Sequence, residues 1–124
     1  MKLFVGMDVS LEKSALCVLS EHGEVVKEAE VVCEPEAIGS FLNALEGDIE
    51  LIGLEAGPLS QWLHRSLTEG GFDIVLMETR QVKGALKAMP IKTDRRDAEG
   101  IARLLHLGWF RPVHCKSVSA QELR

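Results

Sequence analysis

Four carboxylates stand where their side chains could bind divalent cations. Asp8 and Glu55 lie in two short apolar runs, and Asp94 and Asp97 lie at the start of a helical pattern. A carboxylate among apolar side chains is costly unless it is paired or binds a metal ion. Oxygen ligands of this kind are the ones that Mg²⁺ prefers.

The helical pattern places both aspartates on its apolar side. With 3.6 residues per turn, Asp94 and Asp97 share a side with Ala98, Ile101 and Leu105. The opposite side carries charged residues that can pair four positions apart: Arg95, Glu99 and Arg103. We therefore expect the two aspartates to face the sheet that carries the other two carboxylates.

Carboxylates that converge repel one another, and their pKa values rise if they stay unpaired. Two divalent cations about 3.5–4 Å apart would remove that repulsion, activate a nucleophile and stabilise a leaving oxygen in phosphodiester displacement. The sequence thus favours a catalytic site for Mg²⁺ or Mn²⁺ formed by Asp8, Glu55, Asp94 and Asp97.

Each carboxylate also has a purely structural interpretation. Asp94 could be the N-cap or first-turn acid of its helix, favoured by the helix dipole, and Asp97 could be an exposed acid of the same turn. Glu55 could end its strand at the surface. Asp8 is the hardest to explain in this way, because its neighbours are apolar on both sides.

The elements that must position these residues alternate between strand and helix periodicity. We expect strands at 3–9, 14–20, 24–32, 49–56 and 72–77, with helices at about 35–46, 58–69, 80–89 and 93–107. Trp62 falls on the side of its helix that we expect in the core. Three antiparallel strands followed by β-α-β units predict an α/β, ribonuclease-H-like fold, a mixed five-stranded sheet with flanking helices.

Composition agrees with one globular domain of 124 residues. The net charge of −5 conceals two halves: residues 1–78 carry a net charge of −11, and residues 79–124 carry +6. No apolar run approaches the roughly 18 residues of a membrane span, and no signal peptide is recognisable. Three cysteines without metal-ligand spacing indicate a reducing compartment, the cytoplasm.

The basic half contains an ordered stripe of positive charge. Arg80, Lys83 and Lys87 recur at helical spacing, and Lys92, Arg95 and Arg96 extend the surface beside the expected metal site. Such side chains bind phosphates and supply affinity without reading sequence. A solvated helix face is the alternative interpretation.

Three stretches of the chain resemble the DEDD transposases of bacterial insertion sequences: VGMDVS (5–10), GLEAG (53–57) and KTDRRDA (92–98). The stretches at 78–83, 100–102 and 108–114 are also similar to that family, so the resemblance spans essentially the whole chain. It implies a RuvC-like domain whose DEDD metal ligands are Asp8, Glu55, Asp94 and Asp97.

The resemblance also implies partners. Members of the family use a structured guide RNA that bridges target and donor DNA, and a separate C-terminal domain supplies a nucleophilic serine. We expect a RuvC-like domain over residues 1–115, the start of a connecting helix over 116–124, a homo-oligomer and no membrane association.

The leading hypothesis is therefore the N-terminal catalytic domain of a DEDD transposase that acts on DNA with Mg²⁺. The alternative is an RNA-binding and oligomerisation module that is inert without its C-terminal domain. A small-molecule phosphotransferase would need phosphate-binding glycine loops and a second domain. A junction-resolving nuclease shares the carboxylates but does not explain KTDRRDA or GWFRPVH.

Overall fold

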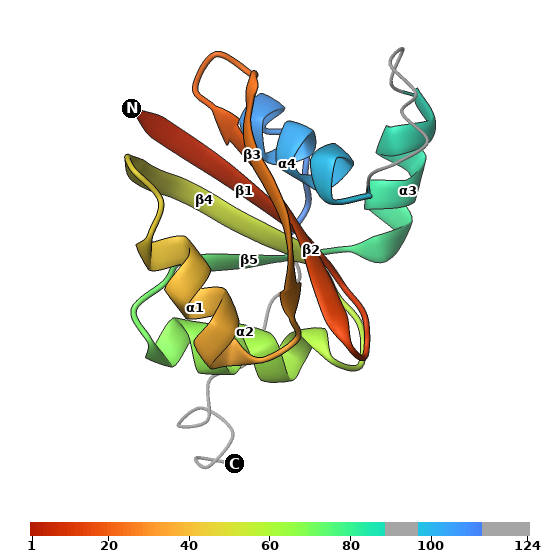
Figure 1. The fold of residues 1–124 in the computed structure, drawn as a ribbon. Helices are drawn as coiled ribbons and strands as arrows, with labels where there is room; N and C mark the ends of the chain where they lie inside the picture. The colour runs from red at the N-terminus through yellow and green to blue at the C-terminus, as the bar shows by residue number, and fades with distance from the viewer. Residues whose placement is uncertain (89–96, 113–124) are drawn as a thin grey trace, which may run out of the picture.

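The computed structural model describes residues 1–88 and 97–112 of the chain. The elements are β1 (Lys2–Val9), β2 (Lys13–Ser20), β3 (Val25–Val32), α1 (Pro35–Asn43), β4 (Asp48–Glu55), α2 (Ser60–Glu69), β5 (Ile74–Met77), α3 (Thr79–Ala88) and α4 (Asp97–Leu107). This order confirms the predicted succession of strands and helices (Figure 1).

The strands form one mixed sheet in the order β3-β2-β1-β4-β5. β2 is antiparallel to β1 and β3, whereas β4 is parallel to β1 and β5 is parallel to β4. β1 is central and nearly all apolar because both of its faces are covered by helices. The predicted α/β architecture with a mixed five-stranded sheet is confirmed.

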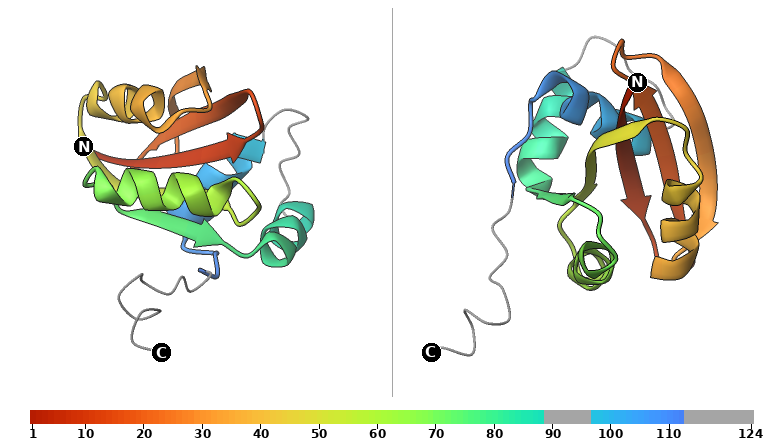
Figure 2. Two further views of the ribbon diagram at one scale, coloured as in Figure 1. Left: turned by 90° about the horizontal axis from the view of Figure 1, so that it is seen from below. Right: turned by 90° about the vertical axis from the view of Figure 1, so that its left-hand side faces the viewer.

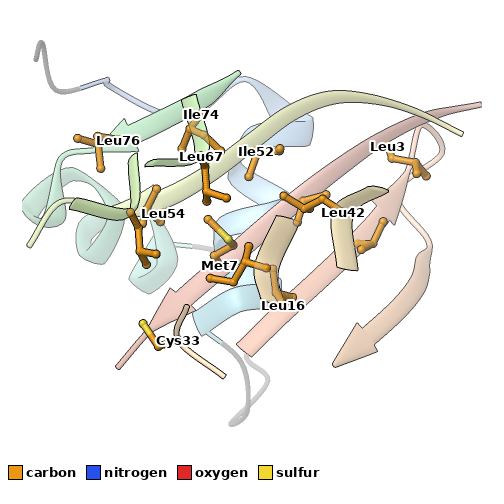
Figure 3. Close-up of a cluster of buried hydrophobic side chains, with 14 residues drawn as sticks. Leu3, Met7, Leu16, Cys33, Leu42, Ile52, Leu54, Leu67, Ile74 and Leu76 are labelled. Atoms are coloured by element: carbon orange, nitrogen blue, oxygen red, sulfur yellow. The ribbon is translucent and has the colours of Figure 1, made fainter. Parts of the chain in front are cut away.

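Helices cover both faces of the sheet (Figure 2). The odd-numbered side chains of β1 pack with α1 and α2 in the larger core, to which Ile38, Leu42, Leu63 and Leu67 contribute (Figure 3). On the other face, Ile101, Leu104 and Leu105 of α4 pack with Val82 of α3 and with Met77. Gly6 and Asp8 share the parity of Phe4, which packs against the α4 face.

Gly6 allows α4 to lie directly on β1. A Cβ atom at this position would overlap the carbonyl oxygen of Ala98 and lie 2.5 Å from the backbone nitrogen of Ala102. The helix can therefore approach the strand this closely only where the side chain is a hydrogen atom. The glycine two residues before Asp8 thus fixes the height of α4 above the sheet.

The segment after α4 returns to the sheet edge. Gly108 has a φ of 76°, which ends the helix in the left-handed region. Glu78 N donates a hydrogen bond to the Arg111 carbonyl at 3.0 Å, and Met77 pairs with Pro112 in an antiparallel bridge. Gln81 holds the segment through the Trp109 carbonyl at 3.1 Å. This segment therefore extends the sheet beyond β5.

Some expectations need correction or fall outside the description. Trp62 is 47% exposed, so its predicted place in the core is wrong. α4 is described only from Asp97, so the predicted start near residue 93 and the connecting helix at 116–124 lie outside the described residues. Within the described ranges, no helix is long and apolar enough to cross a membrane.

Candidate metal centre

Asp8 and Glu55 lie side by side at the carboxyl ends of neighbouring parallel strands. The last paired residues of β1 and β4 are Met7 and Leu54, and the two carboxylates follow them directly. Their parity places them on the sheet face that α4 covers. Carboxyl ends of parallel strands are where open α/β sheets bind their ligands.

Asp97 is the third carboxylate of the site. It is the first described residue of α4, and Ala98, the next residue, is the one that lies over Gly6. The charge of Asp97 acts on both strand carboxylates. Asp94, the fourth predicted ligand, lies outside the described residues. The fold therefore brings Asp8, Glu55 and Asp97 together.

The electrostatics of the site reflect this convergence. Partial desolvation by the surrounding protein raises the pKa of Asp8, although its side chain stays exposed, and the negative charge of Asp97 raises it further. The pKa of Glu55 is raised by burial first and then by Asp97 and Asp8, whereas the positive charge of Lys83 lowers it. Both groups are thus held in surroundings that disfavour their charged forms.

The site is more open than its apolar sequence context indicates. Asp8 and Asp97 are exposed and Glu55 is half-buried. The apolar neighbours of Asp8 on β1 point to the opposite face, so they bury the strand without covering the carboxylate. The predicted cost of a carboxylate within an apolar core is therefore smaller than the sequence suggests.

The oxygen donors fit a hard divalent cation in chemical type. In the described part of the chain, however, no three Asp, Glu, His or Cys side chains lie close enough together to hold a metal ion. The described carboxylates are therefore close enough to repel one another without already being drawn to ligating distances.

Three hydrogen bonds fix the backbone that carries Glu55. Ser60 Oγ donates to the Glu55 carbonyl at 2.5 Å, and Ala56 N donates to the Met77 carbonyl at 2.9 Å. Thr79 Oγ1 donates to the Ala56 carbonyl, also at 2.9 Å. The starts of α2 and α3 are thus tied to the end of β4. Neither Ser60 nor Thr79 was predicted to support the site, although small hydroxyl residues at a helix start are a recognisable signal.

A serine side chain also fixes the turn that follows Asp8. Ser10 N and Ser10 Oγ both donate to the Lys13 carbonyl, at 3.0 and 2.6 Å. This turn and the loop after β4 border a cavity of about 450 Å³, which Asp8 and Glu55 both line. The site therefore has an open space beside its carboxylates.

The basic stripe is described only in part. Arg80, Lys83 and Lys87 are exposed on α3, and Val82 is buried on the opposite side, as the helical spacing predicted. Lys83 is the member whose charge reaches Glu55. Lys92, Arg95 and Arg96 lie outside the described residues.

Known proteins resemble the chain in both sequence and fold. A family model described as Transposase, of the IS110 DEDD type, matches residues 5–124. The protein named as transposase y4qE of Sinorhizobium fredii is 30% identical over 114 residues, which cover 89% of this chain and 29% of that protein. The transposase of insertion sequence element IS1533 from Leptospira borgpetersenii is 31% identical over 107 residues, or 84% of this chain and 31% of that protein.

The fold comparison is equally direct. The structure of T. thermophilus RuvC in complex with a Holliday junction substrate has a TM-score of 0.62 and 16% identity, covering 91% of this chain and 100% of that one. A second T. thermophilus RuvC structure has a TM-score of 0.61 and 14% identity, with coverages of 90% and 99%. The predicted RuvC-like fold is confirmed. The chain spans about 30% of the length of the two transposases.

Proposed function

The chain belongs to the IS110-type DEDD transposase family, and on that premise we propose that it performs divalent-metal-dependent phosphodiester chemistry on DNA during insertion-sequence transposition. The observation that carries the proposal is the convergence of Asp8, Glu55 and Asp97 from three separate elements onto one end of the sheet. A purely structural role for each residue would not require them to meet.

Asp8, Glu55 and Asp97, together with Asp94, would hold Mg²⁺ or Mn²⁺. The bound cations would activate an oxygen nucleophile and neutralise charge that develops on the phosphate. The carboxylates supply hard oxygen ligands, and the hydrogen bonds of Ser60 and Thr79 keep the backbone at Glu55 in place. In the metal-free protein these carboxylates would repel one another, and a bound cation would remove that repulsion.

The α3 surface would hold the nucleic acid. Arg80, Lys83 and Lys87 present positive charge beside the carboxylates, and Lys92, Arg95 and Arg96 would continue it. Contacts of this type bind the phosphate backbone and weaken as salt concentration rises. We include in the proposal that the partners are DNA and a structured guide RNA, that the protein acts as a homo-oligomer, and that a C-terminal domain contributes the nucleophilic serine.

The second candidate is a module that binds RNA and oligomerises but has no catalytic activity of its own. The observation that favours it is the incomplete set of metal ligands among the described residues. The two candidates differ in whether the four carboxylates bind a divalent cation.

Isothermal titration with Mn²⁺ and with Mg²⁺ tests the proposal. We expect binding to the wild-type chain and its loss in the double variant Asp8→Asn with Asp97→Asn. The matched control is Asp48→Asn with Asp73→Asn, because these exposed aspartates lie at the amino ends of β4 and β5, the opposite edge of the sheet.

Nicking of supercoiled plasmid, with the chain alone and joined to its downstream domain, supplies the second measurement. Metal binding that survives in the site double variant, or that is absent in the wild type, would refute the catalytic proposal and leave the binding module.

A further inference from the structure

The cavity beside the carboxylates is lined by apolar side chains as well as by acidic ones. It lies between the turn after β1 and the loop after β4, and its volume is about 450 Å³. Asp8 and Glu55 line it together with Val9 at the end of β1 and with Leu11 and Leu59 from the two loops. A single ligand that fills the cavity would therefore contact both these apolar side chains and the carboxylates.

Leu11 is the most exposed large apolar side chain of the described residues, at 83%. It follows Asp8 by three residues and lines the same cavity as Pro58, which is also exposed. Single exposed leucines are common on protein surfaces. This one, however, lies with a proline at a cavity that contains the candidate catalytic groups.

The polar side chains of the two loops are already engaged. The Ser10 hydroxyl donates its proton to the Lys13 carbonyl, and the Ser60 hydroxyl donates its proton to the Glu55 carbonyl. Neither hydroxyl has a second proton to offer a ligand. Whatever enters the apolar part of the cavity is therefore held mainly by shape and apolar contact.

We propose that this cavity receives one nucleobase of the DNA strand, unstacked from its neighbours, while the adjoining phosphodiester lies at Asp8 and Glu55. The inference rests on the proposed function, because the phosphodiester places the base. The volume falls within the range of about 300–1,000 Å³ that is typical of small-ligand sites. Unstacking a base is unfavourable, and apolar contacts on its faces help to offset the lost stacking.

The chemistry of the walls also predicts selectivity. Discrimination among bases depends on hydrogen bonds to their edges. Because the Ser10 and Ser60 hydroxyl protons are engaged, neither side chain can donate a hydrogen bond to a base edge, so we expect little preference between purines and pyrimidines. Its contribution would be to hold the strand in position and not to choose the sequence.

Methyl-labelled leucine NMR of the 124-residue chain tests the subsite. The probes are the dinucleotide pTpT and an abasic dinucleotide of the same charge, each titrated in Mg²⁺. We expect the Leu11 methyl signals to move with pTpT and to stay in place with the abasic probe. The methyl signals of Leu107, 48% exposed at the end of α4, serve as the internal control and should not move with either probe.

The variant Leu11→Ser supplies the affinity measurement, with Leu107→Ser as its matched control. We expect Leu11→Ser to weaken pTpT binding about tenfold and to leave the abasic probe unaffected, because an apolar contact is lost. Equal affinity of wild type and Leu11→Ser for pTpT, or equal Leu11 shifts with both probes, would overturn the base subsite alone. If neither probe binds in a manner that depends on Mg²⁺ and Asp8, the proposed function falls as well, and the subsite with it.

Discussion

Replacing Gly6 by alanine should lift α4 from the sheet. A Cβ at this position would overlap the Ala98 carbonyl oxygen and lie 2.5 Å from Ala102 N, whereas ordinary van der Waals contact begins at 3.4 Å. The obstructing atoms belong to helix backbone, which no side-chain rotation can move. The helix would therefore have to shift outward by about 0.9 Å or more.

The magnitude follows from what α4 buries. Its buried face consists of Ala98, Ile101, Ala102, Leu104 and Leu105. A gap of about 0.5–1 Å forfeits a quarter to a half of each dispersion contact, and overpacking of cores typically costs about 1–3 kcal/mol. Because the whole helix must move, we expect Gly6→Ala to reduce the free energy of unfolding by about 3 kcal/mol, near the upper end of that range.

Urea denaturation followed by far-UV circular dichroism measures this change. With a slope of about 1.5 kcal/mol/M, a loss of that size lowers the midpoint by about 2 M. Metal affinity should fall in parallel, since α4 carries Asp97 away from Asp8 and Glu55.

Two other glycines provide graded controls. Gly84→Ala on α3 meets nothing within 4 Å and should stabilise the protein by about 0.5–1 kcal/mol, because alanine favours the helix. Gly53→Ala meets the side chains of Leu105 and Met77 at 3.0 Å and should cost less than Gly6→Ala, because side chains can rotate away. A Gly6→Ala protein within about 0.5 kcal/mol of the wild type would refute this account of how α4 is seated.

Two further predictions concern charge. Because the folded-state pKa values of Asp8 and Glu55 are raised, the folded protein binds protons at these groups more tightly than the unfolded chain does. The two carboxylates therefore destabilise the folded state only when they are charged: the effect is absent at low pH and grows as the pH rises through those pKa values. Asp8→Asn should therefore stabilise the protein in EDTA at pH 7, by less than about 1 kcal/mol at this exposed site, and this gain in stability should vanish below about pH 4. The unfolding midpoints of wild type, Asp8→Asn and the control Asp48→Asn across this pH range test the prediction. Destabilisation by Asp8→Asn at pH 7 would contradict it. Lys83→Glu with Lys87→Glu should weaken binding to a structured RNA or DNA and reduce its salt dependence, measured by fluorescence anisotropy at several salt concentrations. The control pair Lys2→Glu with Lys27→Glu, exposed on β1 and β3 away from α3, should have little effect. Unchanged affinity in the first pair would remove α3 from the interface.

The succession of elements could be read from the sequence because each element carries its own periodicity. The apolar run of β1 predicts a strand covered on both faces, and the stripe of Ile101, Leu104 and Leu105 predicts the buried side of α4. The pairing of Arg103 with Glu99, four residues apart, was also predictable, and their atoms lie 2.9 Å apart. Such patterns are local, so a short window of sequence contains them.

The exposure of individual side chains was less predictable. Trp62 lies on an apolar stripe, yet it is 47% exposed. Asp8 lies among buried neighbours on β1, yet it is exposed, because those neighbours point to the opposite face of the sheet and do not cover it. Burial depends on what another element covers, and the sequence of one element does not contain that information.

By itself the sequence determined the chemical types at the site, because residue identity alone fixes whether a side chain is an oxygen ligand or a cation. It also determined which residues of each element share a face. Only the tertiary structure decided that Asp8, Glu55 and Asp97 meet, that the charge of Lys83 reaches Glu55, and that Leu11 borders the cavity lined by Asp8 and Glu55. These relations join β1, β4, α3 and α4 across long sequence separations. They depend on the parallel register of β1 with β4 and on the glycine that lets α4 lie against the sheet.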